Sequence, residues 1–304
     1  MKLKIIVGSN NMELCIAQMS FIPLTQKKLL SKRFSGTPIE LAESLLRIKT
    51  QYRREKKKKY VNLIFDNFIE DANGDLIGGK LGRDIEKKLP KHNDEGFYKK
   101  IDELSPFVDF FWERSEQILL VEKNSSVFNN YENVFNSIQA HLNNLLEEYD
   151  YNVYIEPITE EKNFWEAYEK FKWLFEVTFE LHMPNLGGMT QENLKKSLNK
   201  INEDTNATSY LQSYFNPDGK LKLDRADPII EMFLKWVING GGSWKMRGKS
   251  VEGSKRETLT SKKSVNIKTE SVCIELNDYS AEEVKSIFSY VIPKITDMRR
   301  KRKK

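Results

Sequence analysis

The stretch Leu174-Phe-Glu-Val-Thr-Phe-Glu-Leu-His182 alternates apolar with polar residues over most of its length. A period of two places successive side chains on opposite faces of a strand, so the pattern predicts a half-exposed strand. Met183-Pro-Asn185 and the glycines that follow predict its end. A strand of this kind is typical of a sheet with one covered and one solvated face.

The segments that precede this strand alternate between strands and helices. The predicted strands are 107–113, 116–122 and 151–157. The predicted helices are 130–149, with apolar residues at helical spacing, and 159 to about 172, with an acidic first turn. This order predicts an α+β fold, with a mixed or antiparallel sheet and helices packed on one face.

The first hundred residues give fewer signals. Residues 2–8 predict a strand with 21–24 as its partner, and Thr37-Pro38 begins a capped helix. A strand is also predicted at 60–66. We expect the basic residues 52–59 to form a tail or loop, and 80–105 to form loop with short helices. A domain boundary near 105 would separate an N-terminal α+β region, 1–105, from an α+β body, 106–304.

The C-terminal part predicts three helices, a β-hairpin and a terminal helix. The predicted helices are 190–202, 206–216 and 229–237, the last ending at the triple glycine Gly240-Gly-Gly242. The predicted strands are 243–251 and 257–276. Ser280 and the two glutamates that follow predict the start of the terminal helix.

The composition predicts a folded protein of the cytoplasm. The chain has 304 residues, and its 17 Phe, 12 Tyr and 5 Trp are too many for a disordered protein. No apolar run approaches the roughly 20 residues of a membrane helix, which argues against membrane insertion. Cys15 and Cys273 are the only cysteines, as expected in a reducing compartment without disulfides.

Positive charge is concentrated in two segments. Residues 27–59 contain 12 Lys or Arg against 3 Asp or Glu, and residues 240–304 contain 16 against 8, although the net charge of the whole chain is only +5. The segment between them, 60–239, is therefore acidic. Clustered positive charge is typical of proteins that bind polyanions.

The sequence contains no motif for a metal, a cofactor or a catalytic residue. His92, His141 and His182 are far apart, and neither a phosphate-binding glycine loop nor a nucleophile motif is present. This favours a protein that is not an enzyme. One alternative is a metal-dependent nuclease that uses carboxylates in 66–88. Its candidate residues are Asp66, Asp71, Asp75, Asp84 and Glu86, with Lys88 beside them.

The best local candidate for a site is the basic hairpin after the triple glycine. Trp244, Met246 and Gly248 alternate with Lys245, Arg247 and Lys249, so a strand here places all three cations on one face. Their spacing of about 6–7 Å is similar to that of phosphates along one DNA strand. Further expected contacts are Lys255, Arg256, Lys262 and Lys263 in the hairpin and Arg53, Arg54, Lys56, Lys57, Lys58 and Lys59 in the first basic segment.

The order of elements over about 107–298 resembles that of RexA-like phage-exclusion proteins and related bacterial phage-defence proteins. The likeness lies in a strand that ends Glu-Leu-His-Met-Pro-Asn185, a helical stretch, a polar hairpin after the triple glycine and a terminal amphipathic helix. It implies DNA binding without sequence preference, a homodimer and a partner effector protein. It implies no catalytic residue.

We therefore expect a sensor or regulatory component of bacterial anti-phage defence that binds nucleic acid, and duplex DNA in preference to RNA. The nuclease and a protein-interaction module with an acidic partner are the alternatives. Metal dependence separates the nuclease from the first hypothesis, and salt dependence with competition by DNA separates the interaction module from it.

Overall fold

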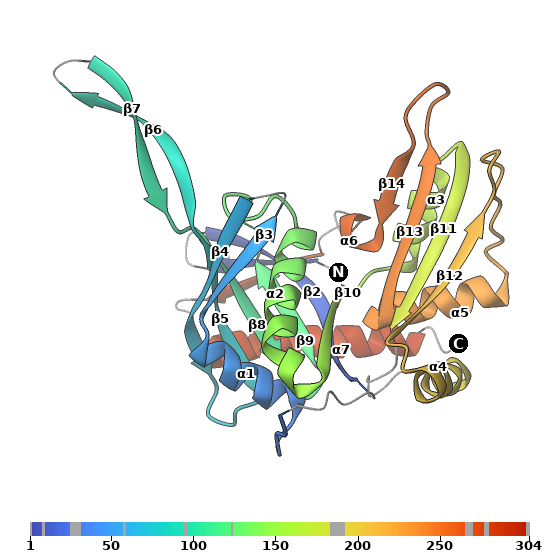
Figure 1. Ribbon diagram of the computed structural model, residues 1–304, viewed down its shortest axis with the longest axis horizontal. Coiled ribbons are helices and arrows are strands. Elements are labelled where there is room, and N and C mark those ends of the chain that lie inside the picture. Colours follow the sequence, from blue (N-terminus) through green and yellow to red (C-terminus); the bar gives the residue numbers. More distant parts are fainter. Residues whose placement is uncertain are drawn as a thin grey trace.

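The computed structural model describes residues 2–7, 10–24, 32–56, 59–93, 96–122, 124–182, 192–264, 270–276 and 280–301. Their strands form a nine-stranded sheet, a four-stranded sheet and a separate two-stranded hairpin (Figure 1). Among the described residues, all paired strands are antiparallel except β1 with β15. The predicted α+β class is confirmed.

The nine-stranded sheet is arranged around the long strand β2. Its strands are β1 (Lys2–Val7), β2 (Asn10–Pro23), β3 (Gln51–Lys56), β4 (Lys59–Glu70), β5 (Leu76–Arg83), β8 (Phe107–Glu113), β9 (Ile118–Glu122), β10 (Tyr151–Pro157) and β15 (Glu270–Leu276). Their order is β15-β1-β2-β9-β8-β5-β4-β3, and β10 pairs with β2. The sheet thus takes strands from both sides of residue 105.

Helices cover both faces of this sheet. On one face, α1 (Pro38–Ile48) and α2 (Tyr131–Leu146) pack on a core that includes Phe65 and Phe135, and a short turn of helix (Glu147–Tyr149) leads from α2 into β10. On the other face, α7 (Ala281–Lys301) buries Ile287 and Phe288 against Leu14 of β2. A capping box formed by Thr37 and Glu40 begins α1 at the predicted position.

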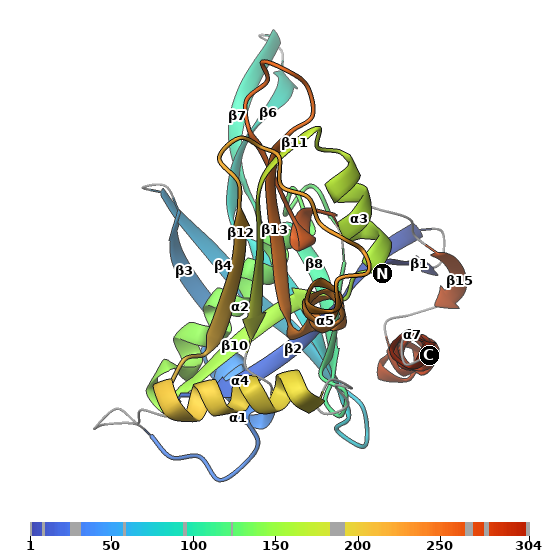
Figure 2. The ribbon, with the colours of Figure 1, turned by 90° about the vertical axis from the view of Figure 1, so that its right-hand side faces the viewer.

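The four-stranded sheet has one covered and one open face. Its strands, in spatial order, are β12 (Ser209–Phe215), β11 (Trp173–His182), β13 (Gly242–Lys249) and β14 (Glu257–Thr260). Helices α3 (Glu161–Glu169) and α5 (Pro228–Trp236) lie together on one side of it (Figure 2). Helix α4 (Glu192–Thr205) precedes β12, and α6 (Ser261–Ser264) follows β14. Phe164, Phe179 and Trp244 belong to the core under the covered face.

A glycine permits close contact between the two sheets. After α5 the chain continues as a π-helical turn (Val237–Gly241), in which Gly240 has a φ of 83°. A Cβ atom on Gly240 would lie 2.3 Å from the Cβ of Gln18 in β2. Only glycine fits this left-handed conformation at such a distance, so the turn packs directly on β2.

The prediction of loop with short helices over 80–105 is wrong. Strand β5 extends to Arg83, and β6 (Ile85–Asn93) pairs with β7 (Gly96–Leu104) in a hairpin that projects from the body (Figure 1). Most of its side chains are exposed, including Phe97 at 88%. Because the hairpin has no buried face, its sequence lacks the alternation that marks a strand.

Four further local predictions are wrong because sheet pairing outweighs local pattern. The basic residues after α1 form β3 and the start of β4 rather than a tail or loop. Residues 209–215 form β12 rather than a helix, since they pair with β11. The predicted strand 257–276 is divided into β14, α6 and β15, and the partner of β1 begins at Asn10, well before residue 21.

His141 makes the stability of the core depend on pH. Its Nε2 atom lies 3.1 Å from the carbonyl oxygen of Lys49, and its ring stacks on Phe65. Burial lowers the pKa of His141 to about 4. Since an unfolded histidine titrates near 6.5, the unfolded state binds the proton first. We expect neutral, buried His141 to contribute fully to the free energy of unfolding above pH 6.5. That contribution should fall by about 3 kcal/mol towards pH 4.

The measurement is the free energy of urea unfolding between pH 4.5 and 7.5. His141→Gln should remove most of this component, so the stability difference between wild type and variant should shrink as the pH falls. His92→Gln, at an exposed position of β6, is the matched control and should leave the pH dependence unchanged. A constant difference between wild type and His141→Gln across this range would contradict the assignment.

Candidate nucleic-acid interface

The predicted alternation in β13 is present in the structure. Trp244, Met246 and Gly248 are buried, while Lys245 and Arg247 are exposed and Lys249 is partly exposed. The three cations therefore lie on the open face of the four-stranded sheet. The indole of Trp244 and the side chain of Met246 fix the strand from the covered side, because both belong to the core beneath it.

Hydroxyl and apolar side chains surround these cations on the open face. Register places Thr260 beside Lys245 and Thr258 beside Arg247 on β14. On the far strand β12, Leu211 and Phe215 are 61% and 63% exposed. Hydroxyl groups donate well to phosphate oxygens, and exposed apolar side chains offer contact to sugars or bases.

Two carboxylates of β11, Glu176 and Glu180, lie on the open face, and Glu176 partly neutralises its cations. Glu176 lies opposite Arg247 and forms an ion pair with Lys245, with 3.2 Å between Oε1 of Glu176 and Nζ of Lys245. Burial of Glu176 opposes its ionisation, but Lys245, Thr178 and Arg247 outweigh this effect and hold its pKa below the usual value. Glu176 is therefore ionised at neutral pH, and it reduces the positive potential at the centre of the sheet.

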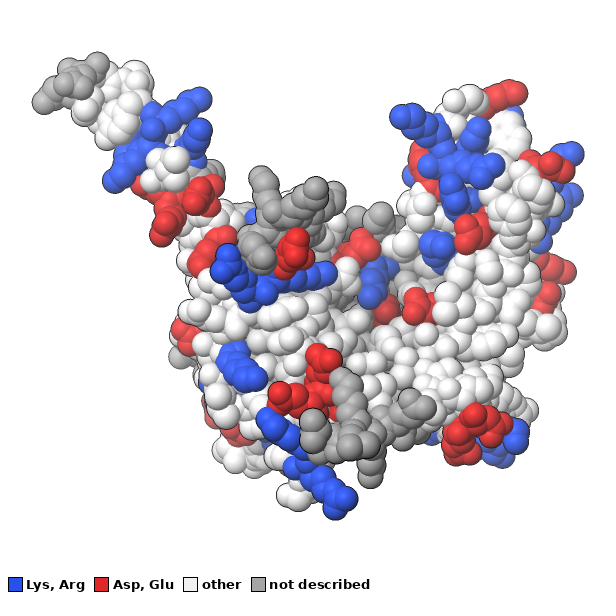
Figure 3. Space-filling model, in the orientation of Figure 1, with Lys and Arg blue, Asp and Glu red and all other residues white. Residues whose placement is uncertain are grey.

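The cations towards the free end of the hairpin are less compensated. Among the residues that the structure describes, Arg247, Lys249 and Lys255 have no ion-pair partner. The guanidinium carbon of Arg256 lies 3.8 Å from the ring centroid of Phe175, which holds this cation in place. Figure 3 shows Lys and Arg gathered at this end of the hairpin. These cations are therefore available to an anionic ligand.

Lys262 does not belong to this exposed group. Its ammonium nitrogen lies 3.2 Å from Oε1 of Glu156, and the same oxygen lies 3.1 Å from Nε2 of His182. The side chains of Glu156 and His182 are each 4% exposed, and that of Lys262 is 15% exposed. Burial opposes the charge on Glu156, but Lys262 and His182 lower its pKa below the usual value. The structure gives Lys262 a buried partner, and the side chain of Lys263 is outside the described residues.

The first basic segment lies elsewhere on the molecule. Arg53 and Arg54 are neighbours in β3, so their side chains leave opposite faces of this edge strand. The side chains of Lys56 and Lys59 are not described, and Lys57 and Lys58 are outside the described residues. Figure 3 shows basic groups over β3 and β4 that are separated by a hollow from those on the β13–β14 hairpin. On the face that Figure 3 shows, these two groups do not merge into one patch.

The carboxylates of the nuclease hypothesis are dispersed. Asp71 is buried and lies 2.9 Å from the ammonium group of Lys285 on α7. Asp84 accepts hydrogen bonds from Asn62 and Ser105, both at 2.7 Å. Glu86 is exposed on the projecting hairpin. Within the described ranges, no three His, Cys, Asp or Glu side chains come together as metal ligands.

Lys262 and Lys255 provide a test that separates burial from charge. We expect Lys262→Ala to lower the free energy of unfolding by about 3 kcal/mol, because it leaves Glu156 buried without its cation. Lys255→Ala, at an exposed site of the same hairpin, should change it by less than about 0.5 kcal/mol. Urea unfolding measures both. A stable Lys262→Ala protein that has lost nucleic-acid binding would instead make Lys262 a contact residue.

Comparisons with protein-family models, with curated proteins and with solved structures give no match to this chain. Among the described helices, none is both long and apolar enough to cross a membrane. The function must therefore be inferred from the geometry: an open sheet face with aligned cations on one strand, hydroxyl groups on the next and a basic hairpin end above them.

Proposed function

We propose that this protein binds nucleic acid, and duplex DNA in the first place, through the open face and free end of the β13–β14 hairpin. The observation that supports this most is the alignment of Lys245, Arg247 and Lys249 on one face of β13, with their intervening residues buried. A strand fixed from its covered side presents its cations with little loss of conformational entropy on binding.

The contacts in this proposal are to phosphates. Lysine and arginine side chains on a sheet face, with threonine hydroxyls beside them, recognise the backbone rather than the edges of bases. Binding should therefore be nearly independent of sequence and should weaken steeply with salt. Lys255 and Arg256 at the end of the hairpin would extend the contact beyond the three cations of β13.

The biological role in this proposal is that of a sensor or regulatory component in bacterial anti-phage defence, acting with a partner effector protein and as a homodimer. It rests on the resemblance in element order to RexA-like phage-exclusion proteins. The protein needs no catalytic residue for this role, because the bound nucleic acid is the signal. Sedimentation of the protein with and without DNA tests the dimer separately from binding.

Neutralising the three aligned cations should weaken binding and its salt dependence together. We expect Lys245→Gln/Arg247→Gln/Lys249→Gln to reduce the slope of log K against log salt by up to about 3, one unit for each lost phosphate contact. The measurement is fluorescence anisotropy with labelled duplexes of unrelated sequence between low and moderate salt. Similar affinity for all duplexes, within about a hundredfold, is expected of the wild type.

The matched control neutralises three lysines on one helix. Lys195, Lys196 and Lys200 lie on α4, away from the hairpin. Their combined replacement by Gln changes the net charge equally, so it should leave the salt slope almost unchanged. Equal losses in both triple variants would show that binding follows net charge and not the geometry of β13.

Removing the carboxylate that pairs with Lys245 should have the opposite effect. Glu176→Gln releases Lys245 from its ion pair, and exposed pairs of this kind are worth about 0.2–1 kcal/mol. We therefore expect DNA affinity at low salt to rise roughly two- to fivefold. Glu169→Gln, on α3 at the covered side, is the control and should have little effect. Unchanged affinity in Glu176→Gln would place the binding surface away from Lys245.

A further inference from the structure

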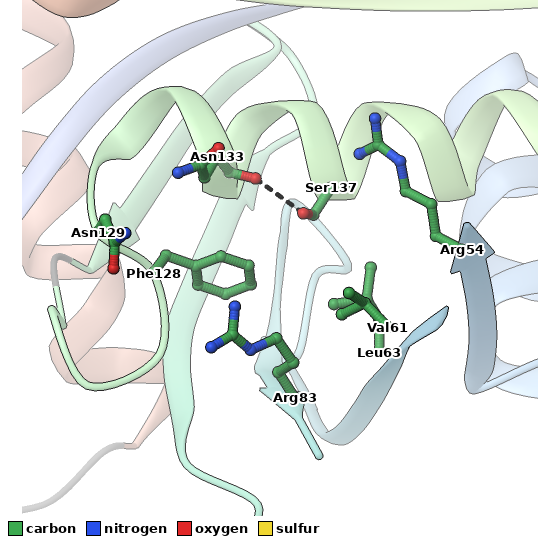
Figure 4. Close-up of a pocket in the computed structure, with 8 residues that line it drawn as sticks. All are labelled: Arg54, Val61, Leu63, Arg83, Phe128, Asn129, Asn133 and Ser137. Atoms are coloured by element: carbon green, nitrogen blue, oxygen red, sulfur yellow. Dashed lines mark hydrogen bonds between the residues drawn. The ribbon is translucent and has the colours of Figure 1, made fainter. Parts of the chain in front are cut away.

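A pocket of about 80 Å³ lies between α2 and strands β3, β4 and β5 (Figure 4). Arg54 of β3 and Arg83 at the end of β5 reach it from different strands, and Phe128, Asn129 and Asn133 line it at the start of α2. Val61 and Leu63 of β4 give it an apolar wall. The pocket is separate from the open sheet face, and nothing in the proposed nucleic-acid interface uses it.

The pocket has two guanidinium groups and no carboxylate. No acidic residue is among those that line it, and within the described part of the chain neither Arg54 nor Arg83 forms an ion pair. Arg54 donates one hydrogen bond, at 3.3 Å, to the carbonyl oxygen of Asn136. The lining thus carries two positive charges and no negative one, which favours an anion in the pocket.

Arg83 also has a buried donor without an acceptor. Its Nε atom is inaccessible to solvent and has no hydrogen-bond partner in the described structure. Its guanidinium carbon lies 5.9 Å from the ring centroid of Phe128, and Figure 4 shows the group beside that ring. An unpaired buried donor costs about 1–3 kcal/mol, so packing beside Phe128 holds Arg83 at the pocket without a protein acceptor for this atom.

We propose that this pocket binds the phosphate group of a phosphomonoester. The forked donors of arginine match the oxygens of phosphate in geometry as well as in charge. The amide groups of Asn129 and Asn133 can supply further donors from the side of α2. A volume of about 80 Å³ corresponds to a few water molecules, which suits a phosphate group but excludes a nucleoside. The group attached to the phosphate therefore lies outside the pocket.

The phosphate could belong to a free small molecule or to the end of a nucleic-acid strand. Three probes separate these sources: inorganic phosphate, a nucleoside 5′-monophosphate, and a short oligonucleotide with and without a 5′-phosphate. Thermal unfolding is measured at constant ionic strength, with chloride as the reference anion. We expect a saturable rise in Tm with inorganic phosphate that chloride does not produce.

The variants are Arg83→Gln, Arg83→Lys and Arg54→Gln, with Arg33→Gln, at an exposed position, as the matched control. Arg83→Gln and Arg54→Gln should each weaken phosphate binding about tenfold or more, because each removes charged hydrogen bonds. Arg83→Lys keeps the charge and loses the fork, so it should also weaken binding. Arg33→Gln should bind as the wild type does.

The protein without added anion gives an independent readout. Because Arg83 has no acceptor in the described structure, Arg83→Gln should leave the Tm in chloride unchanged or raise it, whereas removal of a structural arginine would lower it. A larger effect of the 5′-phosphorylated oligonucleotide than of the nucleoside monophosphate would identify a strand end as the ligand, and the reverse would identify a small molecule. Equal Tm in phosphate and chloride, or wild-type phosphate affinity in Arg83→Gln, would overturn the proposal.

Discussion

The buried polar cluster of Glu156, His182 and Lys262 is the constraint on which the arrangement of the two sheets depends. Glu156 comes from β10 of the nine-stranded sheet, His182 from the end of β11 in the four-stranded sheet, and Lys262 from α6 after β14. A carboxylate that is 4% exposed is stable as an ion only if its partners stay in place. The cluster therefore fixes the base of the basic hairpin relative to the body.

Because the base of the hairpin is fixed, its cations have different surroundings. Lys262 forms an ion pair with Glu156, and Lys245 forms one with Glu176. The cations nearer the free end have no such partner among the described residues. The cations of this segment are thus buried and paired at its base and, in the described structure, exposed without an ion pair nearer its free end. The pocket lined by Arg54 and Arg83 shows the other arrangement, because its lining includes two cations and no carboxylate.

Local pattern predicted several elements that bury one face, but it missed the exposed strands β6 and β7 and also the buried strands β2 and β5. Alternation located β11 and β13, and helical spacing located α1, α2 and α5. Each of these elements has one buried face, and apolar residues recur along that face. The hairpin of β6 and β7 projects into solvent, so its sequence has no periodic pattern of apolar residues. Strand β12 lies at a sheet edge with Leu211 and Phe215 exposed, which obscures its period.

The sequence by itself determined the α+β class and the placing of Lys245, Arg247 and Lys249 on one strand face, because a period of two is a property of the backbone. It could not determine which cations are free. Lys245 meets Glu176 and Lys262 meets Glu156 only through pairing between segments far apart in the chain. Arg83 gave no signal in the sequence, since it joins Arg54 only after β3, β4 and β5 pair and α2 packs on them. Distances between charges follow from tertiary contacts, and these decided both candidate sites.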